Sequence, residues 1–594
     1  MIKTLAKHIN GFVKDSILTP CFMIGEVILE MIIPLMMGAI IDNGVEQGDI
    51  NYICKMGILM VLVAALSLTG GVLGGKYGAR ASAGFARNLR KAMYENIQTF
   101  SFANIDKFST AGLVTRMTTD VTNIQNAYQM LLRMCFRAPF SLIIAMIMSF
   151  LISPRLAGIY LTAMLVLGCI LIFMVRLAMK YFNQVFRKYD DLNESVQENV
   201  SAIRVVKAFV REDYEKNRFT KAAENVYKMF VKAESIVVLN MPVMQATIYT
   251  CILLISWIGA KMVVGSELGT GDLMSMFSYC MNILMSLMML AMIFVMLSMS
   301  IASAERIAEV LNEDSTLKNP EAPVMEVKDG SIRFDHVNFS YTLETSLGTT
   351  GKDGGNKEDT GDWVLKDINL DIHSGETIGI IGGTGSAKTS LVNLVSRIYD
   401  VSEGSISVGG KDVRSYDMEI LRNQVAVVLQ KNVLFSGTIL ENLRWGDKDA
   451  SEEECIRACK LACADDFIES FPEKYNTYIE QGGTNVSGGQ KQRICIARAL
   501  LKKPKILILD DSTSAVDTAT DAKIRKAFRE EIPNTTKLII AQRISSVQDA
   551  DRIIVMENGE INGFGTHEEL LANNEIYRDI YESQTQGGGD FDEQ

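Results

Sequence analysis

The sequence predicts a two-part chain, in which an α-helical half with six membrane-spanning helices precedes an α/β half. Three observations carry this prediction. The apolar residues lie almost wholly before about residue 300. After Arg306, short β-rich runs alternate with helical patterns and Gly-rich turns, which is typical of an α/β domain. The length of 594 residues is too great for one core at roughly 100–200 residues per domain.

Six segments of the first half are long and apolar enough to span a bilayer, because a spanning helix needs ~20 mostly apolar residues. Between the second and third segments, and between the fourth and fifth, lie polar stretches with a helical pattern, 84–128 and 181–231. Each stretch predicts two antiparallel helical extensions of about 30 Å. The predicted spans are 16–42, 53–76, 134–153, 156–179, 235–264 and 272–300.

Charge predicts the orientation of these helices. The long connections carry most of the Lys and Arg residues of this half, whereas the short ones carry one Arg and several acids. By the positive-inside bias, the long connections and both termini are expected in the cytoplasm. The start, Met1 to Lys14, is moderately basic without a small-residue cleavage site, so we interpret it as a lead-in to a retained helix. We therefore expect a multi-pass protein in the lipid bilayer of a bacterial-type plasma membrane.

Composition excludes two other classes of protein. The net charge of −11 argues against a nucleic-acid partner, which would require phosphate neutralisation by basic residues. The ten cysteines follow no dense pattern, so the chain is not a secreted disulfide scaffold.

The second half is expected to form one α/β domain. We place the transmembrane domain at 1–310, a linker at 311–328, the α/β domain at 329–583 and a disordered tail at 584–594. Residues 342–362 are rich in Gly and Thr with little to bury, which predicts a flexible surface loop between two strands. The expected strands include Thr377–Ile381, Val425–Leu429, Ile506–Leu509, Lys537–Ile540 and Arg552–Met556.

A glycine-rich loop between the strand Thr377–Ile381 and a helix predicts a phosphate site. Such a loop points a row of backbone N–H groups at one place. Lys388 is expected to reach the β- and γ-phosphates, and Thr389 to ligate Mg²⁺. Ala387 stands where the P-loop pattern has its last Gly, and we expect it in a right-handed helical conformation that tolerates a methyl group. An ordinary Gly-rich strand–helix turn is the alternative. The loop reads Gly382, Gly383, Thr384, Gly385, Ser386, Ala387, Lys388, Thr389.

Further motifs give the second half a family resemblance. Val486 to Gln490 opens a helix, and the apolar strand Ile506–Leu509 ends in Asp510, a carboxylate placed for Mg²⁺. Together with Gln430 and the segment ending at Asp517, these residues resemble the nucleotide-binding domain of the ABC transporter family. In chain order they look like the Walker A loop, Q-loop, signature motif, Walker B strand and D-loop.

The resemblance implies ATP and Mg²⁺ as cofactors and assigns site residues. Tyr341 looks like the aromatic residue that stacks on adenine. The implied ATP-binding set is Tyr341, Gly382, Gly383, Thr384, Gly385, Ser386, Ala387, Lys388, Thr389, Ser390 and Gln430. The implied Mg²⁺ ligands are Thr389, Gln430 and Asp510. The signature residues, which face the ATP of a partner, are Ser487, Gly488, Gly489 and Gln490, and Asp517 marks the D-loop.

The membrane half resembles the same family at 112–121, 205–212 and 302–307. Six spans fused ahead of one nucleotide domain are similar to an exporter half-transporter. Such proteins work as two halves, with ATP bound between one chain's Walker motifs and the other chain's signature. The resemblance implies ATP hydrolysis coupled to alternating access.

Two positions depart from the family pattern. Asp511 follows the Walker B Asp510 where the family usually has Glu, and its shorter side chain leaves the carboxylate about 1 Å short. Gln542 stands where the family usually has His, and a neutral amide cannot carry a proton. The chain therefore resembles the degenerate-site subunit of heterodimeric multidrug exporters, whose partner carries the catalytic Glu and the switch His.

Alternatives to this interpretation stay open. One is drift at the two positions in a homodimer that tolerates slow turnover. A second is a homodimeric lipid flippase, and a third is an ATP-binding regulatory subunit without transport. In the favoured interpretation the chain moves amphipathic or hydrophobic, drug-like small molecules outward.

The spans carry weaker signals for a substrate cavity. Methionines recur along one face of the sixth span, which suits varied apolar ligands but also helix–helix packing. Glu26 and Glu30 lie one turn apart in the first span, as do Arg133 and Arg137 in the third. Either the pairs neutralise each other or the acids meet a cationic substrate. The cavity candidates are Glu26, Glu30, Met281, Met285, Met288 and Met292.

Overall fold

The computed structural model describes residues 1–341, 363–512 and 515–586. The predicted loop at 342–362 and the end of the predicted tail lie outside these residues. The chain divides into two compact units, Met1–Gln98 with Ala111–Glu313, and Thr99–Thr110 with Asp314–Gln594. The second unit thus begins inside the predicted linker, and it also includes the tip of the first polar extension, which the sequence placed in the transmembrane domain.

The first unit is helical, as predicted. Within its described residues, six helical segments are long and apolar enough to span a membrane, and they contain the predicted spans apart from Ser153 at the end of the third and the last few residues of the sixth. The long helices are α2 (Val13–Ile40), α3 (Ile50–Ile97), α6 (Val121–Ile152), α7 (Pro154–Ser201), α9 (Glu212–Val238), α10 (Asn240–Val264) and α11 (Thr270–Asn312). The short ones are α1 (Ile2–Ala6), α5 (Thr110–Thr115) and α8 (Ile203–Ala208).

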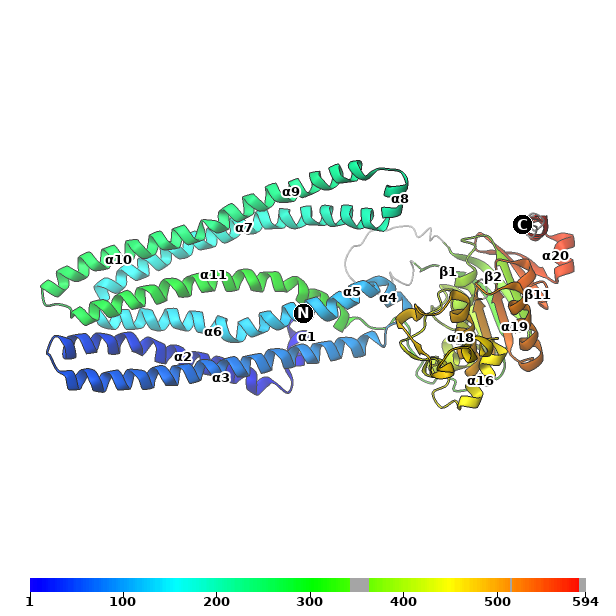
Figure 1. Cartoon of the computed structure of the whole chain (residues 1–594), viewed down its shortest axis with the longest axis horizontal. Helices are drawn as coiled ribbons and strands as arrows, with labels where there is room; N and C mark the ends of the chain where they lie inside the picture. The colour runs from blue at the N-terminus through cyan, green and yellow to red at the C-terminus, as the bar shows by residue number, and fades with distance from the viewer. Residues whose placement is uncertain (342–362, 513–514, 587–594) are drawn as a thin grey trace. The chain divides into compact units, whose positions relative to one another are not determined.

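Helix boundaries follow local signals. Proline suits the first position of a helix, and α7 begins at Pro154 with the Ser153 hydroxyl accepting from the Leu156 N–H at 3.5 Å. Asp49 caps α3 in the same way. Both α3 and α7 continue as single helices beyond the length of a span, and α7 and α9 run side by side (Figure 1). The predicted helical extensions are therefore present.

Buried tyrosines hold the core of the first unit together. This core is formed by apolar side chains of α2, α6, α7, α10 and α11. Tyr160 donates to the Met276 carbonyl oxygen at 2.7 Å, and Tyr279 donates to the Met31 carbonyl oxygen at 2.6 Å. Each hydroxyl is thereby satisfied in an apolar environment, where an unpaired polar group is costly.

An ion pair with a buried carboxylate joins two segments that lie far apart in the sequence. Asp120, at the start of α6, is 1 % exposed. Its carboxylate accepts from Arg306 Nε at 2.8 Å and from the Ser303 hydroxyl at 2.9 Å, both on α11. The segments at 112–121 and 302–307 therefore meet, and the C-terminal part of α11 is tied to the start of α6.

The second unit contains two main sheets. A six-stranded sheet has the order β12-β11-β3-β10-β9-β6, and all its strands are parallel except β12. An antiparallel sheet has the order β2-β1-β4-β5. The strands are β1 (Ile332–Phe339), β2 (Leu365–Ile372), β3 (Thr377–Gly382), β4 (Glu403–Val408), β5 (Lys411–Asp412), β6 (Val425–Val428), β7 (Gly437–Thr438), β8 (Tyr478–Ile479), β9 (Ile506–Asp510), β10 (Thr536–Ile540), β11 (Arg552–Glu557) and β12 (Glu560–Gly565).

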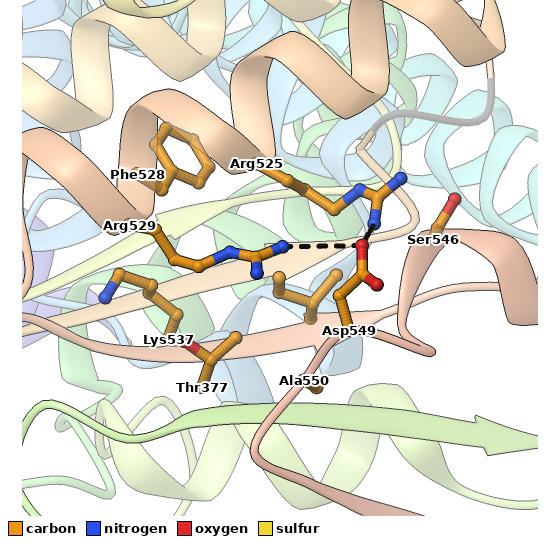
Figure 2. A pocket seen from close by; sticks show the side chains of 9 residues that line it. Thr377, Arg525, Phe528, Arg529, Lys537, Ser546, Asp549 and Ala550 are labelled. Atoms are coloured by element: carbon orange, nitrogen blue, oxygen red, sulfur yellow. Dashed lines mark hydrogen bonds and ion pairs between the residues drawn. The ribbon is translucent and has the colours of Figure 1, made fainter. Parts of the chain in front are cut away.

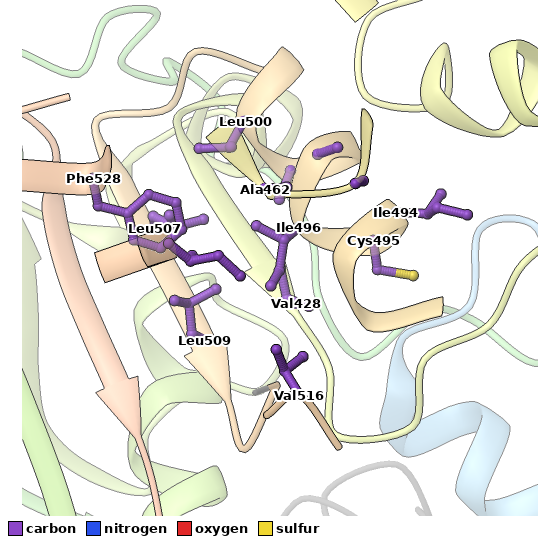
Figure 3. Packing of buried hydrophobic residues seen from close by; sticks show 14 of the residues in the cluster. Val428, Ala462, Ile494, Cys495, Ile496, Leu500, Leu507, Leu509, Val516 and Phe528 are labelled. Atoms are coloured by element: carbon purple, nitrogen blue, oxygen red, sulfur yellow. The ribbon is translucent and has the colours of Figure 1, made fainter. Parts of the chain in front are cut away.

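Helices cover both faces of the parallel sheet. Along β9, Leu507 and Leu509 face α18 and α19, where they pack near Phe528 (Figure 3). Ile506 and Ile508 face the opposite core. A strand buried on both faces is apolar throughout, which is why the continuous apolar run at 506–509 predicts a strand. The helices are α13 (Lys388–Val395), α14 (Met418–Gln424), α15 (Ile439–Leu443), α16 (Glu452–Leu461), α17 (Asp465–Glu469), α18 (Gly488–Leu501), α19 (Thr518–Glu531), α20 (His567–Asn573) and α21 (Glu575–Gln586).

Two segments belong to the second unit more closely than the sequence indicated. Helix α4 (Phe102–Phe108) buries Ala103 in its core, and Asp106 accepts from the Tyr399 hydroxyl at 2.9 Å. Helix α21 continues to Gln586, so the first residues of the predicted disordered tail are helical. Gln584 makes hydrogen bonds there, which a composition-based expectation of disorder could not reveal.

We expect Asp120→Asn to lower the free energy of unfolding of the full chain by about 1–3 kcal/mol, because it replaces a charge-assisted hydrogen bond in a buried position. Thermal melting in detergent measures the loss. Glu95→Gln, on an exposed surface pair of α3, serves as the control and should change the melting temperature little. An equal, small effect of both variants would contradict a structural role for Asp120.

Candidate functional site

Strand register brings the predicted site together. Ile540 of β10 pairs with Ile380 of β3 on one side and with Asp510 of β9 on the other. The three parallel strands therefore end at nearly the same level. The loops that follow them meet at the carboxyl edge of the sheet, which is where open α/β sheets bind ligands.

The glycine loop connects β3 to α13, as predicted. A Cβ atom on Gly382 would lie 2.2 Å from the Met556 carbonyl oxygen, so only glycine fits this position. Gly385 has φ +84°, a left-handed conformation that glycine adopts at low cost. Gly383 and Thr384 complete the turn between them.

Lys388 lies across this loop. Its ammonium group donates to the carbonyl oxygens of Gly382 at 2.9 Å and of Gly383 at 2.7 Å. Burial lowers the pKa of Lys388, and the carboxylates of Asp510 and Asp511 oppose that effect. Lys388 therefore lies between the loop carbonyl oxygens and the two acids, at the place where the sequence predicts a phosphate site.

Ala387 contradicts the sequence-based expectation. It adopts φ 70° and ψ 22°, in the left-handed region, not the right-handed helical conformation we expected. The reason is its position, since α13 begins at Lys388 and Ala387 is the flanking N-cap residue, whose backbone is not helical. A residue with a Cβ atom is destabilised there by roughly 1–2 kcal/mol.

Asp510, the acid that ends β9, contacts Thr389, the predicted Mg²⁺ ligand that follows the glycine loop. The Thr389 hydroxyl donates to the Asp510 carboxylate at 3.0 and 3.2 Å, and Asp510 is 4 % exposed. Burial raises the pKa of Asp510; the Thr389 hydrogen bond opposes this, and the neighbouring Asp511 adds to it. This oxygen donor set among buried acids fits a hard cation such as Mg²⁺.

Asp511, the acid after Asp510, forms hydrogen bonds with the side-chain amides of Gln542 and Gln430. The Gln542 amide donates to Asp511 Oδ2 at 2.7 Å, and the Gln430 side chain also bonds this carboxylate. Burial raises the pKa of Asp511, and the two amide hydrogen bonds act in the opposite direction. The structure thus brings together the two positions at which the sequence departs from the family pattern.

Aromatic side chains surround the predicted adenine platform. The Tyr341 hydroxyl is 2.8 Å from the Ser390 hydroxyl. Its ring meets Phe339 and Tyr399 edge-on, with centroid distances of 4.7 and 5.1 Å. Sequence reasoning missed Tyr399, because no motif marks it and only the fold places it beside Tyr341.

The predicted signature segment opens α18. Ser487 and Gln490 form a reciprocal capping box, which fixes the first turn of the helix. A Cβ atom on Gly489 would lie 2.7 Å from the Ala515 carbonyl oxygen, so this glycine permits a close approach, and Gly488 lies next to it. Asp517 caps α19 by accepting from the Thr520 N–H at 2.9 Å.

In the first unit, the two acids of the first span share one arginine. Arg137 donates to Glu26 Oε1 at 3.0 Å and to Glu30 Oε2 at 2.9 Å. The side chain of Glu26 is 14 % exposed and that of Glu30 38 %. Arg133, which the sequence also offered as a partner, has an Nε atom without a hydrogen-bond partner in the part of the chain that the structure describes.

The methionines of α11 fall into two environments. Met281, Met285 and Met292 are 43 %, 52 % and 63 % exposed in this chain. Met288 instead packs against the apolar core of the unit. Packing within the chain therefore explains why an apolar residue stands at Met288, but it does not explain the other three methionines.

A further cavity lies at the opposite edge of the sheet. Thr377 and Lys537 line it near the amino ends of β3 and β10, and Arg525 and Arg529 converge there on Asp549 at 2.9 and 3.3 Å (Figure 2). The glycine loop lies at the carboxyl ends of the strands, so this cavity at their amino ends is separate from the candidate site.

Known proteins resemble the chain along nearly its whole length. The model of the ABC transporter transmembrane region matches residues 17–288, and the ABC transporter model matches residues 365–514. An uncharacterized ABC transporter ATP-binding protein of Bacillus subtilis, YfiB, is 36 % identical over 562 residues, covering 95 % of each chain. The chain belongs to the ABC transporter family. It is a half-transporter with one membrane region and one ATP-binding domain, and it is a transport-coupled ATPase.

Two other similar proteins have more specific names. An ATP-dependent lipid A-core flippase of Desulfotalea psychrophila is 32 % identical over 540 residues, covering 89 % of this ABC transporter and 90 % of the flippase. A solved structure of a bacterial Atm1-family ABC exporter with ATP bound has a TM-score of 0.78 at 24 % identity, covering 97 % and 99 %. That likeness confirms the predicted fold.

Ala387→Gly should raise the free energy of unfolding by about 0.5–1 kcal/mol, because relief of the left-handed strain exceeds the entropy that glycine adds to the unfolded chain. Thermal melting of the full chain measures this gain. Gly385→Ala places a methyl group on a second left-handed residue and should lower stability by a similar amount. A loss of stability in Ala387→Gly would contradict the strain.

Proposed function

We propose that this ABC half-transporter is the degenerate-site subunit of a heterodimeric exporter. It moves amphipathic or hydrophobic, drug-like molecules outward across the plasma membrane, with its termini and ATP-binding domain in the cytoplasm. The observation that carries the proposal is the hydrogen bond between Gln542 and Asp511 at 2.7 Å. Both residues of this pair depart from the family pattern, and they lie together beside the phosphate loop.

The chemistry of the pair supports slow hydrolysis. A general base must come within hydrogen-bond reach of the attacking water, and Asp511 is one methylene shorter than Glu. Gln542 can donate to a phosphate oxygen but cannot accept and release a proton as imidazole does. This site is therefore suited to holding ATP more than to cleaving it.

Nucleotide binding itself uses an almost complete set of groups. Lys388 and the loop amides bind the phosphates, and Tyr341 stacks on the adenine. Thr389, Gln430 and Asp510 would hold Mg²⁺, which neutralises charge on the β- and γ-phosphates when bound. The hydroxyl of Thr389 and the carboxylate of Asp510 are already adjacent, which supports this assignment.

The intact signature supports a competent partner. Ser487, Gly488, Gly489 and Gln490 would cap the ATP of the other half, which would carry the catalytic Glu and the switch His. Exposed apolar side chains on the second extension support a dimer, since Val205, Phe209 and Val210 are 57 %, 74 % and 80 % exposed. Patches of this kind mark interaction sites, and we propose that the partner half covers them.

A homodimeric lipid flippase is the second candidate. The similarity to a lipid A-core flippase over 89 % of the chain favours it. The mass and subunit composition of the complex purified from its native membrane separate the two candidates. Two different half-transporters support the heterodimer, and two copies of this chain support the flippase.

The membrane unit supports a cationic, amphipathic substrate. Glu26 and Glu30 share one arginine, so the three groups together carry a surplus negative charge. A carboxylate in a low-dielectric cavity attracts a cation far more than a neutral ring. The exposed Met281, Met285 and Met292 of α11 would supply an adaptable apolar surface for such a substrate.

The chain expressed alone should bind ATP and hydrolyse it very slowly. Replacing Asp511 by Glu together with Gln542 by His should raise ATPase activity by at least about ten-fold, because base and proton carrier are both restored. Adding Lys388→Ala should remove the gain and so locate it at this site. Robust turnover by the unmodified chain without a partner would overturn the degenerate-site assignment.

Glu30→Gln should weaken transport of cationic compounds more than transport of neutral analogues. Arg137 remains paired with Glu26 in this variant, so the melting temperature should change little. Arg137→Met is the control, because it leaves two acids without their cation and should lower stability by about 1–3 kcal/mol and affect both analogues. Vesicle flux with matched analogues measures the effect. An equal loss for both in Glu30→Gln would reject the substrate role.

A further inference from the structure

The side chain of Gln584 forms a bridge to the loop that carries Gln542. Gln584 lies in the last turn of α21, at the C-terminal end of the described chain. Its Nε2 donates to the Gln542 carbonyl oxygen at 2.9 Å, and its Oε1 accepts from the Ile544 N–H at 2.9 Å. One amide thus makes two hydrogen bonds to the backbone on either side of residue 543.

The bridged loop has few other backbone contacts that fix residue 542. Before it, the Ala541 N–H donates to the Ile380 carbonyl oxygen at 3.2 Å and extends the register of the sheet. After it, the Ile544 side chain is buried. Gln542 itself is exposed, and its amide reaches Asp511 from this loop. The bond from Gln584 therefore lies at the point where the loop leaves the sheet.

Helix α21 is firmly anchored, so Gln584 has a fixed position. Tyr577 is fully buried, its N–H donates to Asn574 Oδ1 at 2.9 Å, and its hydroxyl lies 2.8 Å from His567 Nδ1. Gln584 lies seven positions after Tyr577, which places the two residues on one face of the helix. The buried ring thus holds the helix so that the amide faces the loop.

We infer that Gln584 is a positioning residue for the ATP site. It fixes the backbone at Gln542 and so sets the distance between that side chain and Asp511. This inference rests on the proposed role of residues 511 and 542 next to the γ-phosphate. Gln584 acts through Gln542, to whose carbonyl oxygen it donates.

The test uses the full chain with the Asp511→Glu and Gln542→His substitutions, in which this site turns over measurably. Gln584→Met keeps the length of the side chain without its hydrogen bonds. Gln584→Glu keeps the acceptor for Ile544 but replaces the donor by an oxygen that faces the Gln542 carbonyl. Glu582→Gln, on the opposite face of α21, is the matched control. The measurements are kcat, the KM for ATP and the melting temperature.

We expect Gln584→Met to lower kcat by about three- to ten-fold, the equivalent of one or two lost hydrogen bonds. The KM for ATP should change less than two-fold, since the phosphate loop is untouched. Gln584→Glu should lose at least as much, and Glu582→Gln should match the parent. An unchanged kcat in Gln584→Met would overturn the inference, as would a loss that follows a lowered melting temperature in all three variants.

A double-mutant comparison separates this inference from the function on which it rests. Residue 542 is replaced by Ala in the Asp511→Glu chain, with and without Gln584→Met. If Ala at 542 lowers kcat and Gln584→Met then has no further effect, Gln584 acts through residue 542. An equal loss in both backgrounds rejects the positioning role. If Ala at 542 leaves kcat unchanged, the proposed role of that position fails, independently of Gln584.

Discussion

The parallel pairing of β3, β10 and β9 is the constraint on which the rest of the second unit depends. Because Ile380, Ile540 and Asp510 stand in one register, their following loops begin at a common edge. The glycine loop, the acids Asp510 and Asp511, and Gln542 are distant in sequence, and the strand register brings them together before their side chains bond one another. Both faces of these strands are covered, and this fixes the register. A one-residue slip of a strand would turn each of its side chains from one core to the other.

Sequence reasoning could predict the elements that are specified locally. The six spans, the helical extensions and the parallel strands follow from apolar length and alternation, and the phosphate motif follows from residue types at fixed spacing. Ala387 shows where such reasoning ends. Its motif position was evident, but its conformation depends on where α13 begins, and helix boundaries are the least predictable feature of a sequence.

Contacts between distant segments were equally inaccessible. Both Arg133 and Arg137 had the spacing to meet the acids of the first span, and only the packed helices show that Arg137 binds both. Tyr399 and Gln584 belong to no motif, yet they lie beside the predicted adenine platform and beside Gln542. In each case the missing information is the relative position of two packed elements, which no local pattern contains.

The close approach of Gly489 to Ala515 has a consequence for cooperativity. Gln492 of the same helix accepts from the Ala515 N–H at 3.1 Å, so the signature helix is joined directly to the segment five residues after Asp510. In a dimer of the proposed kind, these two segments serve different ATP molecules. In such a dimer, a displacement of either segment at one ATP would act on the other. Through this contact, the proposed site, which would hold its nucleotide without cleaving it, would still influence the rate at which its neighbour turns over.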